Sequence, residues 1–141
     1  MIAFTIPVRT TNPNNGATGN SKLAAIIRGR TRKHQRELAG VLTLSHTFRQ
    51  VTLPVVVTVT RVAPSKGLDP HDGLGAALKG VIDGIADGLG LKDDRSSQVT
   101  WRLAQCRGPR GRYEVRVAIE AVSACAETET PPGALSVAAR L

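Results

Sequence analysis

The six aspartates of this 141-residue chain all lie in one short stretch, between residues 69 and 94. They are Asp69, Asp72, Asp83, Asp87, Asp93 and Asp94. A solvated helix surface normally mixes Glu with Asp, and Asp is the poorer helix former, so solubility alone does not explain the restriction to Asp. Carboxylate oxygens are the hard ligands that Mg²⁺ prefers. The stretch therefore predicts a metal-ion site.

The apolar spacing predicts a helix over residues 72–90 with a core face and a carboxylate face. At roughly 100° per residue, six apolar residues fall within about a 100° arc, as on a helix packed against a core. They are Leu74, Leu78, Val81, Ile82, Ile85 and Leu89. Asp72, Lys79, Asp83 and Asp87 fall on the opposite side. Interior glycines each cost roughly 1 kcal/mol against alanine, so those at 73, 75, 80, 84, 88 and 90 predict close packing against another backbone or close approach of a ligand.

Two simpler explanations compete with a metal site. Asp72 could serve only as an N-cap whose carboxylate accepts from exposed backbone N–H groups. Lys79 and Asp83 could form only an i,i+4 surface pair worth a few tenths of a kcal/mol. Neither explanation accounts for the restriction to Asp, or for the Asp93-Asp94 pair after the helix.

These residues resemble the signature of the RusA family of Holliday-junction resolvases. In that family an Asp-x-Asp-Asn-Leu motif opens a helix that carries a lysine and an aspartate, and an Asp-Asp pair follows a short turn. Here residues 69–74 read DPHDGL and precede Lys79, Asp83 and Asp93-Asp94. The strand at residues 99–102 and the run from Asn12 into a basic helix also resemble the phage branch.

Two motif positions depart from the family pattern. Pro70 stands where the first motif aspartate is expected, with Asp69 one residue earlier and His71 one later, and Gly73 replaces the motif asparagine. Asp69 or His71 could therefore supply the first ligand. His is a common ligand for transition metals but a poor one for Mg²⁺.

The resemblance implies a single α+β domain over residues 1–125, with a small mixed or antiparallel sheet and two main helices packed on it. Residues 126–141 are expected to form a flexible tail because they contain few core-forming residues. The implied activity is cleavage of branched DNA by paired nicks from a homodimer. Mg²⁺ is the implied cofactor, with Mn²⁺ as a substitute.

The resemblance also implies roles for individual residues. Asp72 and Asp94, with Asp69 or Asp93, would hold the metal, and Asp83 would be a further ligand or a partner of one. Lys79 would pair with the scissile phosphate or orient water. Family spacing favours Asp94 over Asp93.

Charge is distributed as a nuclease requires, because an acidic centre lies between two basic flanks. The formal net charge is +8. Ten basic and one acidic side chain precede residue 69, and six basic and two acidic ones occupy residues 95–125. The candidate DNA contacts are Arg28, Arg30, Arg32, Lys33, Arg36, Lys66, Lys79, Arg107 and Arg110. Each of these could instead be a solvated surface residue, but the first five crowd nine positions and would repel one another without an anion.

Four further elements complete the predicted domain. Residues 2–6 and 51–62 read as strands, and residues 98–105 and 112–120 as a hairpin. A helix is expected over residues 22–44, with a possible break at Gly29. Its apolar stripe would comprise Leu23, Ile26, Ile27, His34, Leu38, Val41 and Leu42.

Compartment and alternative functions follow from composition. Cys106 and Cys125 lack metal-ligand spacing, and no apolar run approaches the roughly 20 residues that cross a membrane, so a reduced cytoplasmic setting is expected. The alternative to a nuclease is a junction-binding homologue that has lost its chemistry, as Pro70 and Gly73 suggest. A third hypothesis is a basic protein that binds RNA structurally.

Overall fold

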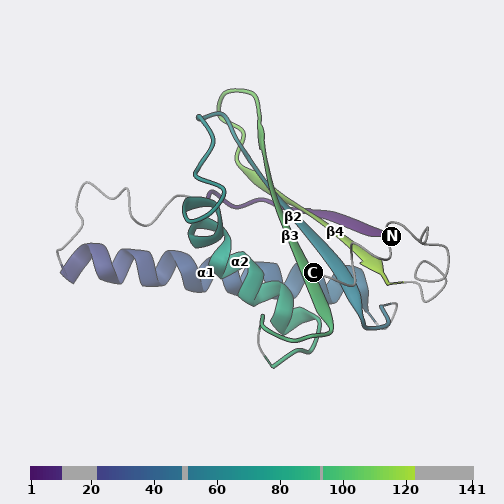
Figure 1. Cartoon of the computed structure of the whole chain (residues 1–141). Coiled ribbons are helices and arrows are strands. Elements are labelled where there is room, and N and C mark those ends of the chain that lie inside the picture. Colours follow the sequence, from purple (N-terminus) through teal and green to yellow (C-terminus); the bar gives the residue numbers. More distant parts are fainter. Residues whose placement is uncertain (11–21, 49–50, 93, 123–141) are drawn as a thin grey trace.

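The computed structural model describes residues 1–10, 22–48, 51–92 and 94–122. Its elements, in chain order, are β1 (Ile2–Ile6), α1 (Lys22–Thr47), β2 (Val55–Ala63), α2 (Gly73–Gly88), β3 (Val99–Arg107) and β4 (Glu114–Ala121) (Figure 1). Asp93, the loop over residues 11–20 and the predicted tail over residues 126–141 lie outside the described residues.

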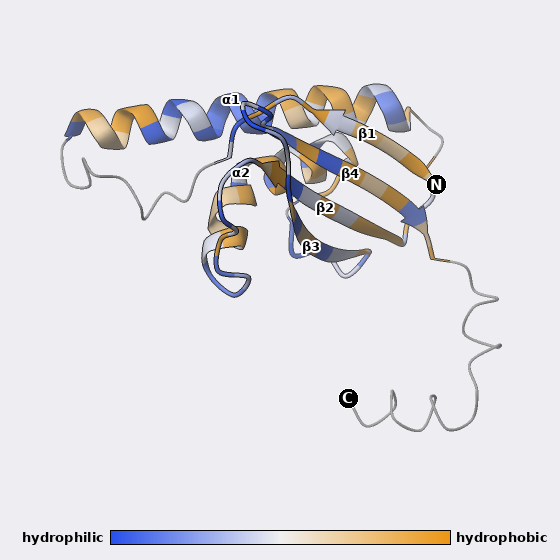
Figure 2. Ribbon diagram, turned by 90° about the horizontal axis from the view of Figure 1, so that it is seen from above, coloured by the Kyte–Doolittle hydropathy of each residue, from blue (hydrophilic) through white to orange (hydrophobic). Residues whose placement is uncertain are grey.

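The four strands form one mixed sheet in the order β1-β4-β2-β3 (Figure 2). β2 runs parallel to β3 and antiparallel to β4, and β1 is antiparallel to β4. One sheet face carries the alternating apolar residues, which join α2 side chains such as Leu78 and Ile85 in a single core. The predicted α+β class, with a small mixed sheet and two helices, is confirmed.

The predicted hairpin between the last two strands is wrong, because β2 lies between β3 and β4. The connection from β3 to β4 passes over the end of β2, where the Gly108 amide donates to the Ala63 carbonyl at 2.9 Å. A Cβ at Gly108 would lie 2.8 Å from Val62 Cγ1, so this crossing requires glycine. Alternating apolar residues define the buried face of a strand, but they do not define its neighbour.

The strand predicted over residues 51–62 begins at Val55 instead. Pro54 has no N–H to give to a ladder, and β2 is an interior strand paired on both sides, so the pairing starts directly after the proline. Val51 and Leu53 still contribute to the core as partly buried side chains.

Helix α1 is continuous through Gly29 and extends to Thr47. Of its predicted apolar stripe, Leu38 and Leu42 pack against the core as partly buried side chains, but the other five residues are exposed. Leu23, Ile26, Ile27 and Val41 are all more than half exposed, and His34 is exposed. The buried positions are instead Ala24, Gln35, Ala39, Thr43 and Thr47. Small residues face inward because α1 packs very closely against α2.

Three glycines spaced four residues apart on α2 make this close packing possible. A Cβ at Gly84 would overlap the Arg36 carbonyl oxygen, and one at Gly88 would lie 2.8 Å from the Gly40 carbonyl oxygen. At Gly80 it would lie 3.1 Å from the Arg32 carbonyl oxygen. The predicted contact of these glycines with another backbone is confirmed, and that backbone is α1.

Candidate functional site

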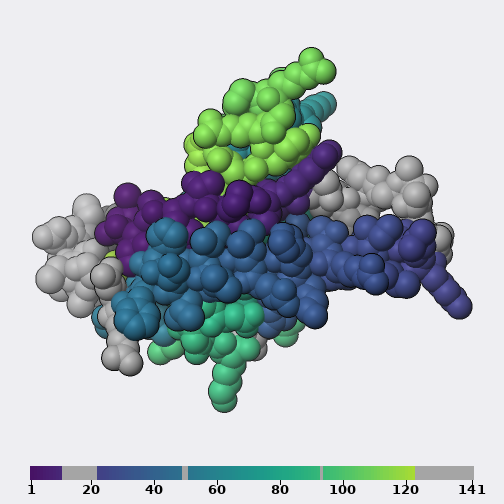
Figure 3. Space-filling model, turned by 180° about the vertical axis from the view of Figure 1, so that it is seen from behind, coloured from purple at the N-terminus to yellow at the C-terminus, as the bar shows by residue number. Residues whose placement is uncertain are grey.

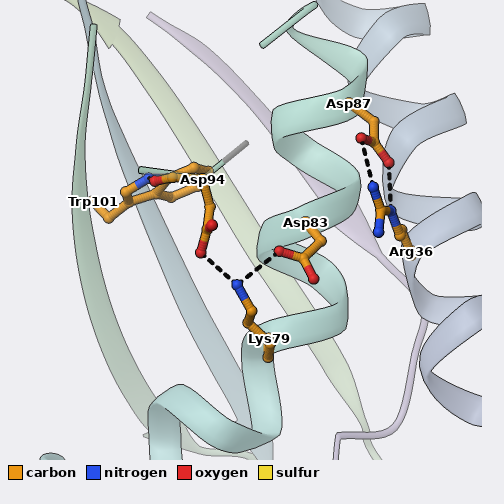
Figure 4. Close-up of polar contacts among 6 residues, drawn as sticks. All are labelled: Arg36, Lys79, Asp83, Asp87, Asp94 and Trp101. Atoms are coloured by element: carbon orange, nitrogen blue, oxygen red, sulfur yellow. Dashed lines mark hydrogen bonds and ion pairs between the residues drawn. The ribbon is translucent and has the colours of Figure 1, made fainter. Parts of the chain in front are cut away.

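Lys79 lies at the centre of an ionic cluster on the exposed side of α2 (Figure 4). Its Nζ lies 2.6 Å from Asp94 Oδ2 and 2.9 Å from Asp83 Oδ1. The Lys79 side chain is 43% exposed, whereas those of Asp83 and Asp94 are 21% and 23% exposed. Two largely buried carboxylates therefore meet at one ammonium that solvent and ligands can reach.

The end of α2 turns the chain so that Asp94 returns to Lys79. Gly90 has φ of 77°, and its amide donates to the Asp87 backbone carbonyl. The Leu91 amide donates to the Ala86 backbone carbonyl. This is the Schellman arrangement, in which a left-handed residue terminates the helix and satisfies its last carbonyls. The Trp101 indole Nε1 on β3 then donates to the Asp94 backbone carbonyl at 2.7 Å. Asp94 is thus positioned from both α2 and the sheet.

The pKa values of Asp94 and Lys79 are shifted in opposite directions. The hydrogen bond from Lys79 lowers the pKa of Asp94 below its usual value. The hydrogen bond to Asp94, assisted by Asp83, raises the pKa of Lys79. Near neutral pH Asp94 and Lys79 are therefore both charged, and the lysine neutralises the Asp94 carboxylate.

Three predicted residues lie at the other end of α2, and all are exposed. Asp69 Oδ1 accepts from the His71 amide at 3.0 Å, which closes a local turn before the helix. Asp72 occupies the N-cap position, but its side chain makes no capping hydrogen bond. The simple N-cap explanation for Asp72 is therefore wrong, and its carboxylate points to no backbone partner at the helix start.

Asp72 and Lys79 are seven residues apart, or about 10 Å along the helix axis, on the same side of α2. The structure does not bring the predicted residues together as a single group. Within the described ranges, no three His, Cys, Asp or Glu side chains are close enough to hold one metal ion. Asp93 lies outside those ranges.

The donor chemistry of the cluster nevertheless fits Mg²⁺. This ion is commonly held by one or two carboxylates, with waters and substrate phosphates completing its octahedron. Asp83 and Asp94 present oxygens to one common point, which Lys79 Nζ fills. A metal bound there would require the lysine to move aside.

Asp87 is separated from this cluster because it faces α1 (Figure 4). Its carboxylate accepts from Arg36 Nε at 2.6 Å and from Nη2 at 3.0 Å. These hydrogen bonds lower the pKa of Asp87 and raise that of Arg36. Arg36, which was predicted to contact DNA, thus forms a bidentate salt bridge that links α1 to α2.

The other predicted DNA contacts lie on two parts of the molecule. Arg30, Arg32 and Lys33 are exposed on α1, and Arg28 is partly buried there. The remaining basic residues, Lys66, Arg107 and Arg110, are exposed near the carboxyl ends of the parallel strands β2 and β3. Arg107 Nε donates to the Pro64 carbonyl at 3.2 Å, which joins the two loops at that end.

Arg61 is a basic residue that sequence reasoning missed. It is only 5% exposed on β2, and its guanidinium donates to the Thr10 carbonyl and hydroxyl. Burial lowers the pKa of this guanidinium. Arg61 lines a cavity of about 210 Å³ with Ser65 and Arg107. The sequence did carry a signal for its burial, because Arg61 follows the buried Val55, Val57 and Val59 at the two-residue spacing of one strand face.

Comparison with known proteins adds no family assignment, since no protein-family model and no curated protein matches this chain. In the part of the chain that the structure describes, no helix is both long enough and apolar enough to cross a bilayer.

Proposed function

We propose that this chain is a divalent-metal-dependent endonuclease that hydrolyses phosphodiester bonds in branched DNA, Holliday junctions in particular, as a homodimer making paired nicks. The observation that carries the proposal is the meeting of Asp83 and Asp94 at the Lys79 ammonium, in a position open to solvent. The resemblance of this segment to the RusA motif supports the substrate class.

Phosphodiester hydrolysis requires an activated water and neutralisation of the charge that builds on the phosphoryl oxygens. A bound Mg²⁺ supplies much of that neutralisation and lowers the pKa of water. Asp83 and Asp94, whose oxygens meet at one point, would hold it, with waters and phosphate oxygens as its other ligands. The RusA pattern makes Asp72 a further ligand, with Asp69 or Asp93, although Asp69 and Asp72 lie at the other end of α2. Lys79, released from its carboxylates by the incoming phosphate, donates hydrogen bonds to a phosphoryl oxygen.

The positioning of Asp94 supports this division of roles. Its backbone is fixed by Trp101, while its carboxylate accepts from Lys79, a side chain that can exchange partners. A carboxylate held by its backbone keeps its place when its counter-ion moves. Exposed basic residues such as Arg110 and Lys66 would hold the polyanionic backbone, so binding should weaken steeply with salt.

The test is cleavage of a labelled four-way junction, beside a linear duplex of matched sequence, with Mg²⁺, Mn²⁺ or EDTA. We expect metal-dependent symmetric nicking of the junction alone. Asp94→Asn and Lys79→Met should each lower cleavage by about a hundredfold or more. Asp72→Asn should also abolish cleavage and spare junction binding. Asp87→Asn is the matched control, because Asp87 lies on the same helix but faces α1.

A second candidate is a junction-binding protein that keeps the fold without the chemistry. Lys79 already satisfies both carboxylates as a structural ion-pair network would, and Pro70 and Gly73 replace two residues of the RusA motif. Tight junction binding without cleavage in either metal would identify this function and refute the nuclease proposal. Equal binding of junction and duplex, with no effect of Asp94→Asn, would refute both.

A further inference from the structure

Helix α1 carries large apolar side chains on the side that faces away from the rest of the molecule. Nine large apolar side chains are exposed among the described residues, and six of them belong to α1 or to Phe48 directly after it. Figure 3 shows α1 exposed along its length, and its N-terminal half extends beyond α2 in Figure 1. Concentration of apolar surface on one helix indicates a site of association.

The exposed residues of α1 follow the spacing of a coiled coil. Eight positions at alternating steps of four and three residues are all exposed, and we call them the outer seam. They are Leu23, Ile27, Arg30, His34, Glu37, Val41, Leu44 and Phe48. A helix that repeats every 3.5 residues in this way presents one continuous stripe to a partner helix. The buried residues Gln35, Ala39 and Thr43 lie on the opposite side, toward α2 and the sheet.

The seam is apolar at both ends and carries Arg30, His34 and Glu37 in its middle. If a second α1 lies antiparallel, Leu23 meets Phe48 of the partner subunit and Ile27 meets Leu44 of the partner subunit. At the centre His34 meets Glu37 of the partner subunit, and the symmetric pair forms again on the other side. Arg30 lies opposite Val41 of the partner subunit, and its long side chain can extend one turn along the partner helix to the same carboxylate.

A parallel arrangement would place each residue against its own copy. Glu37 would face Glu37 of the partner subunit, and Arg30 would face Arg30 of the partner subunit, which is repulsive. Charge complementarity therefore selects the antiparallel, two-fold symmetric arrangement, in which the same patch serves both copies. We propose that the outer seam of α1 binds the outer seam of a second copy of this chain, forming an antiparallel two-helix dimer interface.

A groove beside the seam is compatible with this partner. It has a volume of about 480 Å³ and is lined by Lys33, Arg36, Glu37, Gly40, Val41 and Leu44 of α1, with Asp87 and Gly88 of α2. Asp87 is already paired with Arg36 there, so the groove adds the apolar surface of Val41 and Leu44 to the interface. The homodimer is part of the proposed function, but this interface depends only on α1 and does not require nuclease activity.

The test is the mass of the full chain without DNA, measured by light scattering during gel filtration over a wide concentration range. We expect a concentration-dependent dimer. Leu44→Asp should raise the dimer Kd by about tenfold or more, because it places a charge in the apolar part of the seam. Ala25→Asp is the matched control, since Ala25 is exposed on α1 outside the seam. Circular dichroism of each variant confirms that the helices form.

The register is tested by a charge exchange and by disulfide trapping. Glu37→Lys should weaken the dimer about tenfold, and adding His34→Glu should restore it by reversing the central pairs. In a Cys106→Ser, Cys125→Ser background, chains with Ile27→Cys should form disulfides with chains carrying Leu44→Cys, and neither should do so with itself. A monomer at all concentrations, or self-linking of Ile27→Cys chains, would overturn the proposal. Absence of cleavage by an intact dimer would contradict the proposed nuclease activity but not the dimer interface.

Discussion

Substitution of Gly84 by alanine should destabilise the protein, although alanine is the better helix former. The new Cβ would overlap the Arg36 carbonyl oxygen and lie 2.7 Å from the Ala39 Cβ, both on α1. A backbone carbonyl cannot rotate away as the end of a flexible side chain can. The two helices must therefore separate, and the core beneath them must readjust. Gly75, on the same helix, has nothing within 4 Å of its Cβ position.

The expected magnitude is the difference between two terms. Overpacking a rigid interface by one methyl group costs about 3 kcal/mol, at the upper end of the usual range. The higher helix propensity of alanine stabilises the helix by about 1 kcal/mol relative to glycine. The net loss for Gly84→Ala is therefore about 2 kcal/mol, or about 8 °C in Tm for a chain of this length. Gly75→Ala keeps only the propensity gain of about 1 kcal/mol and should raise Tm by about 4 °C.

The assay is urea and thermal unfolding followed by circular dichroism at 222 nm, for the wild type and both variants. Equal urea m values would show that the free energy of unfolding, and not the unfolded state, has changed. Gly88→Ala, whose Cβ would lie 2.7 Å from Thr43 Cβ, should resemble Gly84→Ala. A Gly84→Ala protein as stable as Gly75→Ala would refute the close contact between α1 and α2.

Three more outcomes follow from single contacts. The folded-state pKa of Asp94 is lowered, so Asp94 contributes stability that is present above its unfolded pKa of about 3.9 and lost as pH falls through the folded-state pKa. Wild type and Asp94→Asn should therefore converge in urea stability as the pH is lowered below about 3.9. Trp101→Phe removes the donor to the Asp94 carbonyl and should cost about 1 kcal/mol in urea unfolding while lowering any metal-dependent cleavage. Thr43→Val should raise the free energy of unfolding by about 1 kcal/mol, since the buried Thr43 hydroxyl has no hydrogen-bond partner among the described residues; a destabilised variant would contradict this.

The sequence predicted α2 well because its apolar residues and its charged residues both recur at helical spacing. Leu78 and Ile85 are buried as expected, and Lys79 pairs with Asp83 one turn away. The contact between Lys79 and Asp94 was harder to predict, because it depends on the left-handed turn at Gly90. Gly90 was predicted to be an interior glycine of the helix, whereas it follows the helix end and turns the chain in the left-handed region.

The prediction of the buried face of α1 was correct for Leu38 and Leu42 but wrong for the rest of its apolar stripe. Large apolar residues such as Ile27 and Val41 were expected to face the core, yet Ala39 and Thr43 do so. Periodicity identifies an apolar stripe, but it does not say whether this protein or another molecule covers it. The order of the strands escaped prediction for a related reason, since β-branched content marks β2 as a strand but does not place it between β3 and β4.

The glycines of α2 and the outer seam of α1 are two results of one packing arrangement. Because Gly84 and Gly88 admit only backbone and small side chains, α1 must turn residues such as Ala39 inward. The large side chains at neighbouring positions, Val41 and Leu44 among them, then project outward whatever their hydropathy. A helix that meets its own domain through small residues thus keeps its larger apolar side chains available for a second chain. On this view the close helix contact inside the monomer is what makes α1 available for dimerisation.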